Sequence, residues 1–339
     1  MVRTVWHGGT LMTSVLSEPA LASPPRREIV DRRSLGDRIF RKGVTLGALT
    51  AFIVLSLIAS LLFFRGFQIF SAFGLDFITT STWEDVDGTV ENAKFGVAAM
   101  LVGSIVVATI AMAVAFPFVV SSALFLEFYV PHKLKAVLVA ILDLMAAIPS
   151  IIYGLWGYLV LMPLASGWAA SINNYLGWIP IFGVDFDNFE ASPFVSGLVL
   201  ALMVLPIAMS VTREVYSRAP LDQIQAAYAL GGSRWGAIRT VVIPFGRSGL
   251  VGGMLLGMGR ALGETVAVLL TLNLVFEVKF QILASAGGSV ASLIASRFGE
   301  ASPLELKALM AAGLVLFLLT LIVNFGASTI VARAERRVK

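Results

Sequence analysis

The sequence predicts an all-α integral membrane protein with six transmembrane helices. Of its 339 residues, 58% are hydrophobic and only 14% are charged, a balance that soluble globular domains do not have. A helix needs about 20 mostly apolar residues to cross the hydrocarbon of a bilayer. Six runs meet this length with few or no charges, at about 44–64, 97–120, 137–161, 194–212, 249–273 and 308–331.

The third run stays almost uncharged beyond residue 161, but two prolines and two asparagines interrupt it. These residues are Pro163, Asn173, Asn174 and Pro180. Because proline removes a backbone hydrogen-bond donor, we expect the helix to end here and an irregular loop to follow.

Basic residues flank the spans unevenly, and this asymmetry predicts the orientation. Nineteen Lys and Arg lie on one side, in residues 1–43, 121–135, 213–247 and 332–339. The loops on the other side hold five, Arg65, Lys94, Lys279, Arg297 and Lys307. Since short cytoplasmic loops carry the excess of Lys and Arg, both termini are expected in the cytoplasm.

The first 43 residues lack the early apolar core of a cleavable signal. We expect a disordered basic tail over 1–33 and then, from Ser34, a short amphipathic helix that lies flat in the membrane surface. The transmembrane domain follows over 44–332, and residues 333–339 form a short cytoplasmic tail.

Several chemistries are missing from the sequence. It has no cysteine, and its two histidines, His7 and His132, are far apart, so neither thiol nor zinc chemistry is expected. No lysine follows a glycine, which excludes the Gly-Lys-Ser/Thr core of a phosphate-binding loop. We therefore expect no enzyme on this chain and no ATP hydrolysis by it.

A polar segment, 213–247, separates the fourth and fifth spans. Its apolar residues at near-helical spacing are Leu221, Ile224, Tyr228 and Leu230. Gly231 is typical of a helix end, and Ser233 can cap a second helix. Small alanines between the apolar positions predict a helix of low profile, which suits insertion into a groove on another protein.

This segment resembles the coupling motif of ATP-binding-cassette importer permeases. In that motif Glu-Ala-Ala is followed after three residues by Gly and after nine more by Ile-x-Leu-Pro. The matching residues here are Gln225, Ala226, Ala227, Gly231 and Pro244. The resemblance implies the type I importer permease fold and the docking of an ATP-binding subunit on residues 221–231. Gln225 replaces the usual acid, so no salt bridge to the ATPase is implied. An ordinary amphipathic turn is the alternative interpretation.

Three further blocks, 143–157, 244–250 and 257–268, carry a more specific resemblance. Over roughly residues 35–335 the chain is similar to the phosphate permease family of the Pst system, PstC type. Two departures stand out. Asp143 replaces a usual Glu, and the sequence from Phe95 lacks the proline of a Phe-Gly-x-x-Pro pattern.

The resemblance implies a permease subunit of an ATP-driven importer that moves inorganic phosphate across the bacterial cytoplasmic membrane. It implies no cofactor on this chain, since ATP and Mg would bind the partner ATPase. The implied partners are an ATP-binding subunit in two copies, a second homologous permease chain in a heterodimer, an extracytoplasmic phosphate-binding protein and membrane lipid, without nucleic acid. The outward loops at 66–94, 162–193 and 277–305 would either dock the binding protein or serve as solvated connectors.

Two charges are predicted at membrane depth in the fifth span. Arg260 lies thirteen residues after Arg247, about 20 Å along a helix, and an arginine there costs about 3 kcal/mol. Glu264 is one turn further, so the two can form an i, i+4 pair. We expect Arg260 to donate to a tetrahedral oxyanion and Glu264 to accept the proton of a protonated phosphate. A structural ion pair between helices is the alternative.

Asp143, Ser150 and Thr265 are weaker candidates for the substrate pathway. Asp143 enters the third span six residues before Pro149, where a weakened helix would let Ser150 approach a permeating ion. Each could instead serve helix packing. Close packing is also the expected role of six glycines in the fifth span, at 249, 252, 253, 257, 259 and 263.

Three classes of function remain open from the sequence. The first is the phosphate importer subunit, with a permease for another oxyanion as its variant. The second is an ion-coupled secondary carrier that uses Arg260, Glu264 and Asp143 as relay groups. The third is a membrane sensor or scaffold whose 221–231 helix binds a signalling protein.

Overall fold

The computed structural model describes residues 35–184, 188–285 and 287–336, with side chains up to residue 329. The predicted disordered tail over 1–33 lies outside the described residues. The chain divides into two compact units, residues 1–54 and residues 55–339. The first unit, in its described part, is the start of a helix, and the second contains the remaining elements.

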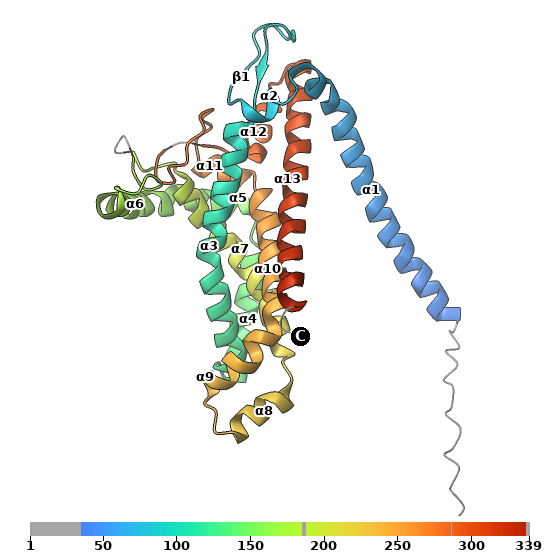
Figure 1. Ribbon diagram of the computed structural model, residues 1–339, viewed down its shortest axis with the longest axis vertical. Coiled ribbons are helices and arrows are strands. Elements are labelled where there is room, and N and C mark those ends of the chain that lie inside the picture. Colours follow the sequence, from blue (N-terminus) through green and yellow to red (C-terminus); the bar gives the residue numbers. More distant parts are fainter. Residues whose placement is uncertain (1–34, 185–187, 286, 337–339) are drawn as a thin grey trace, which may run out of the picture. The chain divides into compact units, whose positions relative to one another are not determined.

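Helices dominate the described chain, as the sequence predicted (Figure 1). In chain order the helices are α1 (Leu35–Phe73), α2 (Asp76–Thr79), α3 (Ala98–Phe128), α4 (His132–Ala147), α5 (Ser150–Trp156), η1 (Gly157–Leu161), α6 (Met162–Leu176), α7 (Pro193–Ser217), α8 (Leu221–Ala229), α9 (Arg234–Ala237), η2 (Ile238–Val242), α10 (Ile243–Leu262), α11 (Val266–Thr271), α12 (Val290–Arg297) and α13 (Pro303–Arg336). Two short antiparallel strands, β1 (Trp83–Glu84) and β2 (Lys94–Phe95), pair Trp83 with Phe95.

Six helical segments of the described chain are long and apolar enough to cross a membrane, which confirms the predicted number. They are Leu35–Phe73, Ala98–Phe128, Ser150–Leu176, Pro193–Ser217, Arg234–Leu262 and Pro303–Thr329. Each overlaps one predicted span, although the bounds differ at three places.

The first difference is at the start of the chain. The predicted flat helix from Ser34 is not a separate element, because α1 runs without a break from Leu35 to Phe73. Residues 35–43 contain no proline, so nothing interrupts the backbone hydrogen bonds between them and the apolar run.

The third predicted span, 137–161, is also divided. Its helix ends at Ala147, and a new one starts at Ser150, because Pro149 cannot donate the backbone bond that would continue the first. Pro163, by contrast, sits in the first turn of α6, where proline is tolerated. The expected irregular loop is therefore wrong for residues 162–176, which are helical.

The fifth predicted span, 249–273, breaks near its end. The helix that carries Arg260 ends at Leu262, and α11 begins only at Val266. The intervening residues, Gly263 to Thr265, include a glycine, the residue with the greatest backbone freedom. This break decides the geometry of the two predicted membrane charges.

Close packing between α7 and α10 fixes the position of the fifth span. Gly249, Gly253 and Gly257 face α7, where a side chain at these positions would run into Val215, Ala208 and Val204. Because these three glycines have no side chains, the backbones of α7 and α10 can approach closely, which confirms the expected packing role. Gly252 and Gly259 are different, since a Cβ atom at Gly252 would meet nothing within 4 Å and one at Gly259 would meet only an atom of Asn324.

The β1–β2 hairpin lies at the end of the long helices opposite α8 and α9 (Figure 1). A cluster of buried apolar side chains surrounds it. Trp83 is buried there, and its Nε1 donates to Glu305 Oε1 of α13 over 2.8 Å. The Ser302 hydroxyl donates to Asp85, a second link between the hairpin and the start of α13. These contacts hold the hairpin to the bundle.

The hairpin turn itself is held by Asp87. Its carboxylate accepts hydrogen bonds from Thr89 and from Asn92 Nδ2. These bonds, first those of the Thr89 and Asn92 side chains, lower the pKa of Asp87 below its ordinary value.

The neighbouring glycines 252 and 253 give a matched test of the packing. A Cβ atom at Gly253 would lie 2.7 Å from the backbone oxygen of Ala208, whereas Gly252 has open space. We expect Gly253→Ala to destabilise the protein by about 1–3 kcal/mol, as overpacking does. Gly252→Ala should be neutral or stabilising, because alanine favours a helix. Thermal melts of the purified protein check this, and equal melting temperatures for the two variants would contradict the packing.

Candidate functional site

Arg260 lies in the last turn of α10, two residues before the helix ends. The C-terminal end of a helix carries a partial negative charge from its unsatisfied carbonyl groups. A cation is therefore favoured at this position, which offsets part of the cost of placing an arginine in an apolar bundle.

The side chain of Arg260 lines a hollow of about 520 Å³. The residues around it come from α7, α10 and α13: Ile207, Gly252, Leu255, Leu256, Gly259, Arg260 and Asn324. Apart from Arg260 and Asn324 these are apolar residues or glycines. The hollow thus combines one cation and one amide with walls that offer no competing hydrogen bonds.

Arg260 has no partner among the residues that the structure describes. Its Nε atom is buried and makes no hydrogen bond, and no carboxylate forms an ion pair with its guanidinium. Its charge acts electrostatically on the hydroxyl of Tyr153 without a hydrogen bond between them. The Tyr153 hydroxyl donates instead to the backbone oxygen of Met145 over 2.9 Å. The guanidinium therefore keeps its donors free for a ligand.

The predicted pair of Arg260 with Glu264 does not form. An i, i+4 pair needs a continuous helix, and the helix ends at Leu262, before Glu264. Glu264 is buried, with 7% of its surface exposed, and its Oε1 accepts from the backbone N–H of Ala267 over 3.3 Å. Its observed role is to bind the start of α11.

The remaining pathway candidates do not converge on the hollow. Asp143 is exposed on α4, and Ser150 begins α5 after the break at Pro149. Thr265 donates to the backbone oxygen of Gly263 over 3.3 Å. Of the five predicted pathway residues, only Arg260 lines the hollow, and the roles of the other four remain predictions.

Asn324 was missed by the sequence analysis. It is an amide within the predicted sixth span, 308–331, where the surrounding residues are mostly apolar. A polar side chain inside a transmembrane helix is costly, and this alone marks such a position for attention. Only the packing of α13 against α10 brings it to Arg260.

The coupling segment, residues 213–247, has the predicted local structure. Gly231 adopts a φ of +81°, a conformation that glycine tolerates, and follows α8. Ser233 caps the next helix by accepting from the N–H of Gly236. Pro244 lies in the first turn of α10.

Helix α8 is attached to the bundle near its middle, and apolar residues at its two ends are exposed. Ile224 is buried against the bundle, with 9% of its surface exposed, whereas Leu221 and Leu230 are 70% and 90% exposed. The next turn is held by Arg234, whose guanidinium lies 4.9 Å from the centre of the Tyr129 ring at the end of α3. A fixed helix with exposed leucines is suited to docking on another protein.

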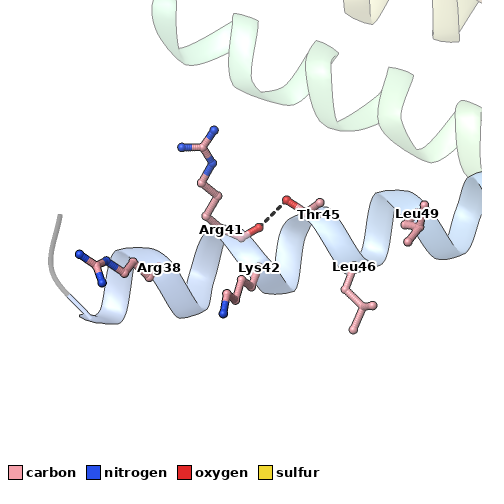
Figure 2. A pocket seen from close by; sticks show the side chains of 6 residues that line it. All are labelled: Arg38, Arg41, Lys42, Thr45, Leu46 and Leu49. Atoms are coloured by element: carbon pink, nitrogen blue, oxygen red, sulfur yellow. Dashed lines mark hydrogen bonds between the residues drawn. The ribbon is translucent and has the colours of Figure 1, made fainter.

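Figure 2 shows the basic start of α1 in the first unit. Arg38, Arg41 and Lys42 lie one or two turns before Thr45, Leu46 and Leu49, and all six side chains come from the same helix. This arrangement is a surface of one helix, whereas the hollow at Arg260 is lined by three helices. Cations next to leucines are typical of a helix at the level of lipid headgroups.

The six apolar helices identify a membrane protein, and the partly buried Arg260 and the exposed leucines at α8 are compatible with a permease. Residues 119–339 match the model of the family described as binding-protein-dependent transport system inner membrane component, and the chain belongs to this family. It is a multi-pass inner membrane protein without an ATPase motif of its own. Membership in this family of ABC importer permeases implies an ATPase and a binding protein as partners.

Named relatives match over most of the chain. Phosphate transport system permease protein PstC 2 of Mycobacterium tuberculosis is 38% identical over 94% of this chain and 98% of its own length. PstC of Mycobacterium leprae is 42% identical over 72% of this chain and 77% of its own. A probable PstC of Methanocaldococcus jannaschii is 36% identical over 84% and 90%.

A solved structure has the same fold. The crystal structure of a bacterial ABC transporter involved in the import of the acidic polysaccharide alginate contains a chain that matches with a TM-score of 0.50. The match covers 87% of this chain and 99% of that one at 16% identity, so it concerns the fold alone.

Two substitutions of Glu264 separate its capping role from its charge. Glu264→Gln keeps an oxygen that can accept from Ala267, whereas Glu264→Ala removes it. We expect Glu264→Ala to cost about 1 kcal/mol, as the loss of a helix cap does, and Glu264→Gln to cost less. Melting temperatures of the purified protein check this order. If both variants were equally unstable, the charge and not the cap would be the stabilising feature.

Proposed function

We propose that this chain is the permease subunit of an ATP-driven importer that moves inorganic phosphate across the cytoplasmic membrane. The observation that carries the proposal is Arg260, a partly buried cation that has no partner among the described residues and lines a hollow with apolar walls. A cation in such a place requires an anion, and the passing substrate is the anion that it would meet.

The chemistry of the guanidinium fits an oxyanion. Arginine presents five N–H donors in a planar fork that matches two oxygens of a tetrahedral anion, and it stays charged at every physiological pH. In the hollow these donors are not used by the protein. Arg260 would hold phosphate briefly between the outer and the inner opening, since a site for transport has to release its ligand.

The choice of phosphate draws on the relatives. Proteins named phosphate transport system permeases are 34–42% identical to this chain over most of its length. Arg260 by itself would suit any oxyanion, so a permease for another oxyanion is the alternative that transport assays have to separate.

Energy would come from a separate ATPase that binds ATP and Mg. The exposed residues Leu221 and Gln225 of α8 and Leu230 just after it support docking of that subunit. One permease chain offers one such helix, so a second, homologous permease and two copies of the ATPase would complete the transporter. A single helical segment from Arg234 to Leu262 links the docking end to Arg260 and would carry the motion.

The positive-inside pattern supports cytoplasmic termini, with α8 and α9 on the same side. The opposite side carries exposed aromatic residues, among them Trp168, Tyr175 and Trp178 on α6 and just after it. These are candidates for docking a phosphate-loaded binding protein. Trp83, which the sequence also places on this side, is buried and would not take part directly.

Replacement of Arg260 tests the proposal most directly. In proteoliposomes containing this chain, the second permease and the ATPase, we expect Arg260→Gln to assemble normally but to lower phosphate uptake at least about tenfold, because a charged hydrogen-bonding group is lost. Arg65→Gln, at an exposed arginine of α1, is the matched control and should transport normally. Loss of the assembled complex in Arg260→Gln would instead assign Arg260 to packing. Uptake by the parent that does not need ATP, or that resists vanadate, would favour a secondary carrier.

The docking helix can be tested without disturbing the core. Leu230 is 90% exposed, so Leu230→Asp should leave the fold intact, while its charge in an apolar interface should release the ATPase. Leu75→Asp is the control, at a leucine that is 77% exposed and directly precedes α2. Helix α2 lies at the opposite end of the bundle from α8 (Figure 1). The measurement is the amount of ATPase that co-purifies with each variant. Normal recovery with Leu230→Asp would exclude this face of α8 as the docking surface.

A further inference from the structure

Arg260 and Asn324 approach each other from two different helices. Arg260 belongs to α10 and Asn324 to α13, and both line the hollow of about 520 Å³. Gly259, next to Arg260, has no side chain, and a Cβ atom there would lie 3.6 Å from Asn324 Nδ2 with no other atom within 4 Å. The glycine therefore leaves the amide of Asn324 open toward the turn that carries Arg260.

Each of these two side chains has a buried polar atom without a partner. Arg260 Nε is a donor with no acceptor, and Asn324 Oδ1 is an acceptor with no donor. A buried polar group without a hydrogen bond costs about 1–3 kcal/mol. The two atoms do not satisfy each other, although both residues line the same hollow. Both atoms are covered in this conformation, so the two side chains have to turn for a ligand in the hollow to reach them.

A ligand that satisfies both atoms has to accept a hydrogen bond and also donate one. Phosphate does this at physiological pH, because it keeps at least one P–OH group beside its charged oxygens. Sulfate only accepts, since it carries no proton. The apolar walls formed by Ile207, Leu255 and Leu256 strengthen this difference, because no polar group there competes for the ligand.

We infer that Asn324 is a specificity-determining residue that, together with Arg260, binds protonated phosphate in this hollow. Arg260 donates to the charged oxygens, and the amide oxygen of Asn324 accepts the P–OH hydrogen. The amide N–H₂ of Asn324 supplies a further donor to the same anion. The inference rests on the proposed function and adds the residue that distinguishes phosphate from sulfate.

A neutral amide is better suited to this role than a carboxylate. Glu264, which the sequence offered as the acceptor, binds the start of α11 and does not line the hollow. A carboxylate beside Arg260 would also pair with the guanidinium and occupy its donors. The amide oxygen of Asn324 accepts the hydrogen of a P–OH group without adding negative charge.

The test uses the assembled transporter with Asn324→Leu and Asn324→Asp. The first removes both hydrogen-bonding groups, and the second keeps the shape but adds a charge that pairs with Arg260. The same two substitutions at Asn273, an exposed asparagine two residues after the end of α11, are the matched controls. Thermal melts with inorganic phosphate or sulfate, at equal ionic strength and without the binding protein, report binding at the permease. Uptake of labelled phosphate from loaded binding protein reports transport.

We expect phosphate to stabilise the parent complex more than sulfate does. Asn324→Leu should remove this preference, and Asn324→Asp should remove the response to both anions. Maximal phosphate uptake should fall about tenfold in both variants, because a hydrogen bond to a charged ligand is lost. The concentration of binding protein that gives half-maximal uptake should not change. Damage to the fold would be recognised by poorer assembly of the complex.

The inference is overturned if the parent takes up phosphate and Asn324→Asp does so at the same rate with its phosphate preference intact. Should Asn324→Leu fail to assemble, the isosteric Asn324→Asp decides. A parent complex that takes up no phosphate overturns the proposed function itself, and the role of Asn324 with it. Uptake of phosphate by the parent together with an equal response to sulfate overturns only the role of Asn324.

Discussion

An arginine without a counter-ion inside an apolar bundle is the constraint on which this structure depends. Placing Arg260 there costs about 3 kcal/mol on insertion scales. The protein does not recover this cost with a salt bridge, because the described residues offer Arg260 no carboxylate. Instead the helix ends two residues later, so that the guanidinium lies near the negative end of the helix dipole. The charge is tolerated and stays available to a ligand.

The packing of α10 serves the same constraint from two sides. On the side toward α7, Gly249, Gly253 and Gly257 remove side chains and let the backbones approach. On another side, Gly252 and Gly259 leave open space that belongs to the hollow. Glycine therefore has two uses in this helix. On one face it allows close packing against α7, and on another it leaves the open space of the hollow.

The coupling segment was predicted well because its signals are local. The φ of +81° at Gly231, the cap by Ser233 and the proline in the first turn of α10 each depend on a few neighbouring residues. The third span was predicted less well, because the effect of a proline on a helix depends on more than its immediate neighbours in the sequence. Pro149 lies at the break between α4 and α5, whereas Pro163 lies inside the continuous helical segment Ser150–Leu176.

The sequence by itself determined that six apolar helices are present, where α8 ends and that an arginine lies in the fifth span. Composition, turn residues and run lengths are properties of consecutive residues. Only the tertiary structure decided what that arginine meets. The helix break at Leu262 separates Arg260 from Glu264, and the packing of α13 brings Asn324 to the same hollow. The partners of a side chain depend on contacts between segments far apart in the chain, and no local pattern in the sequence encodes them.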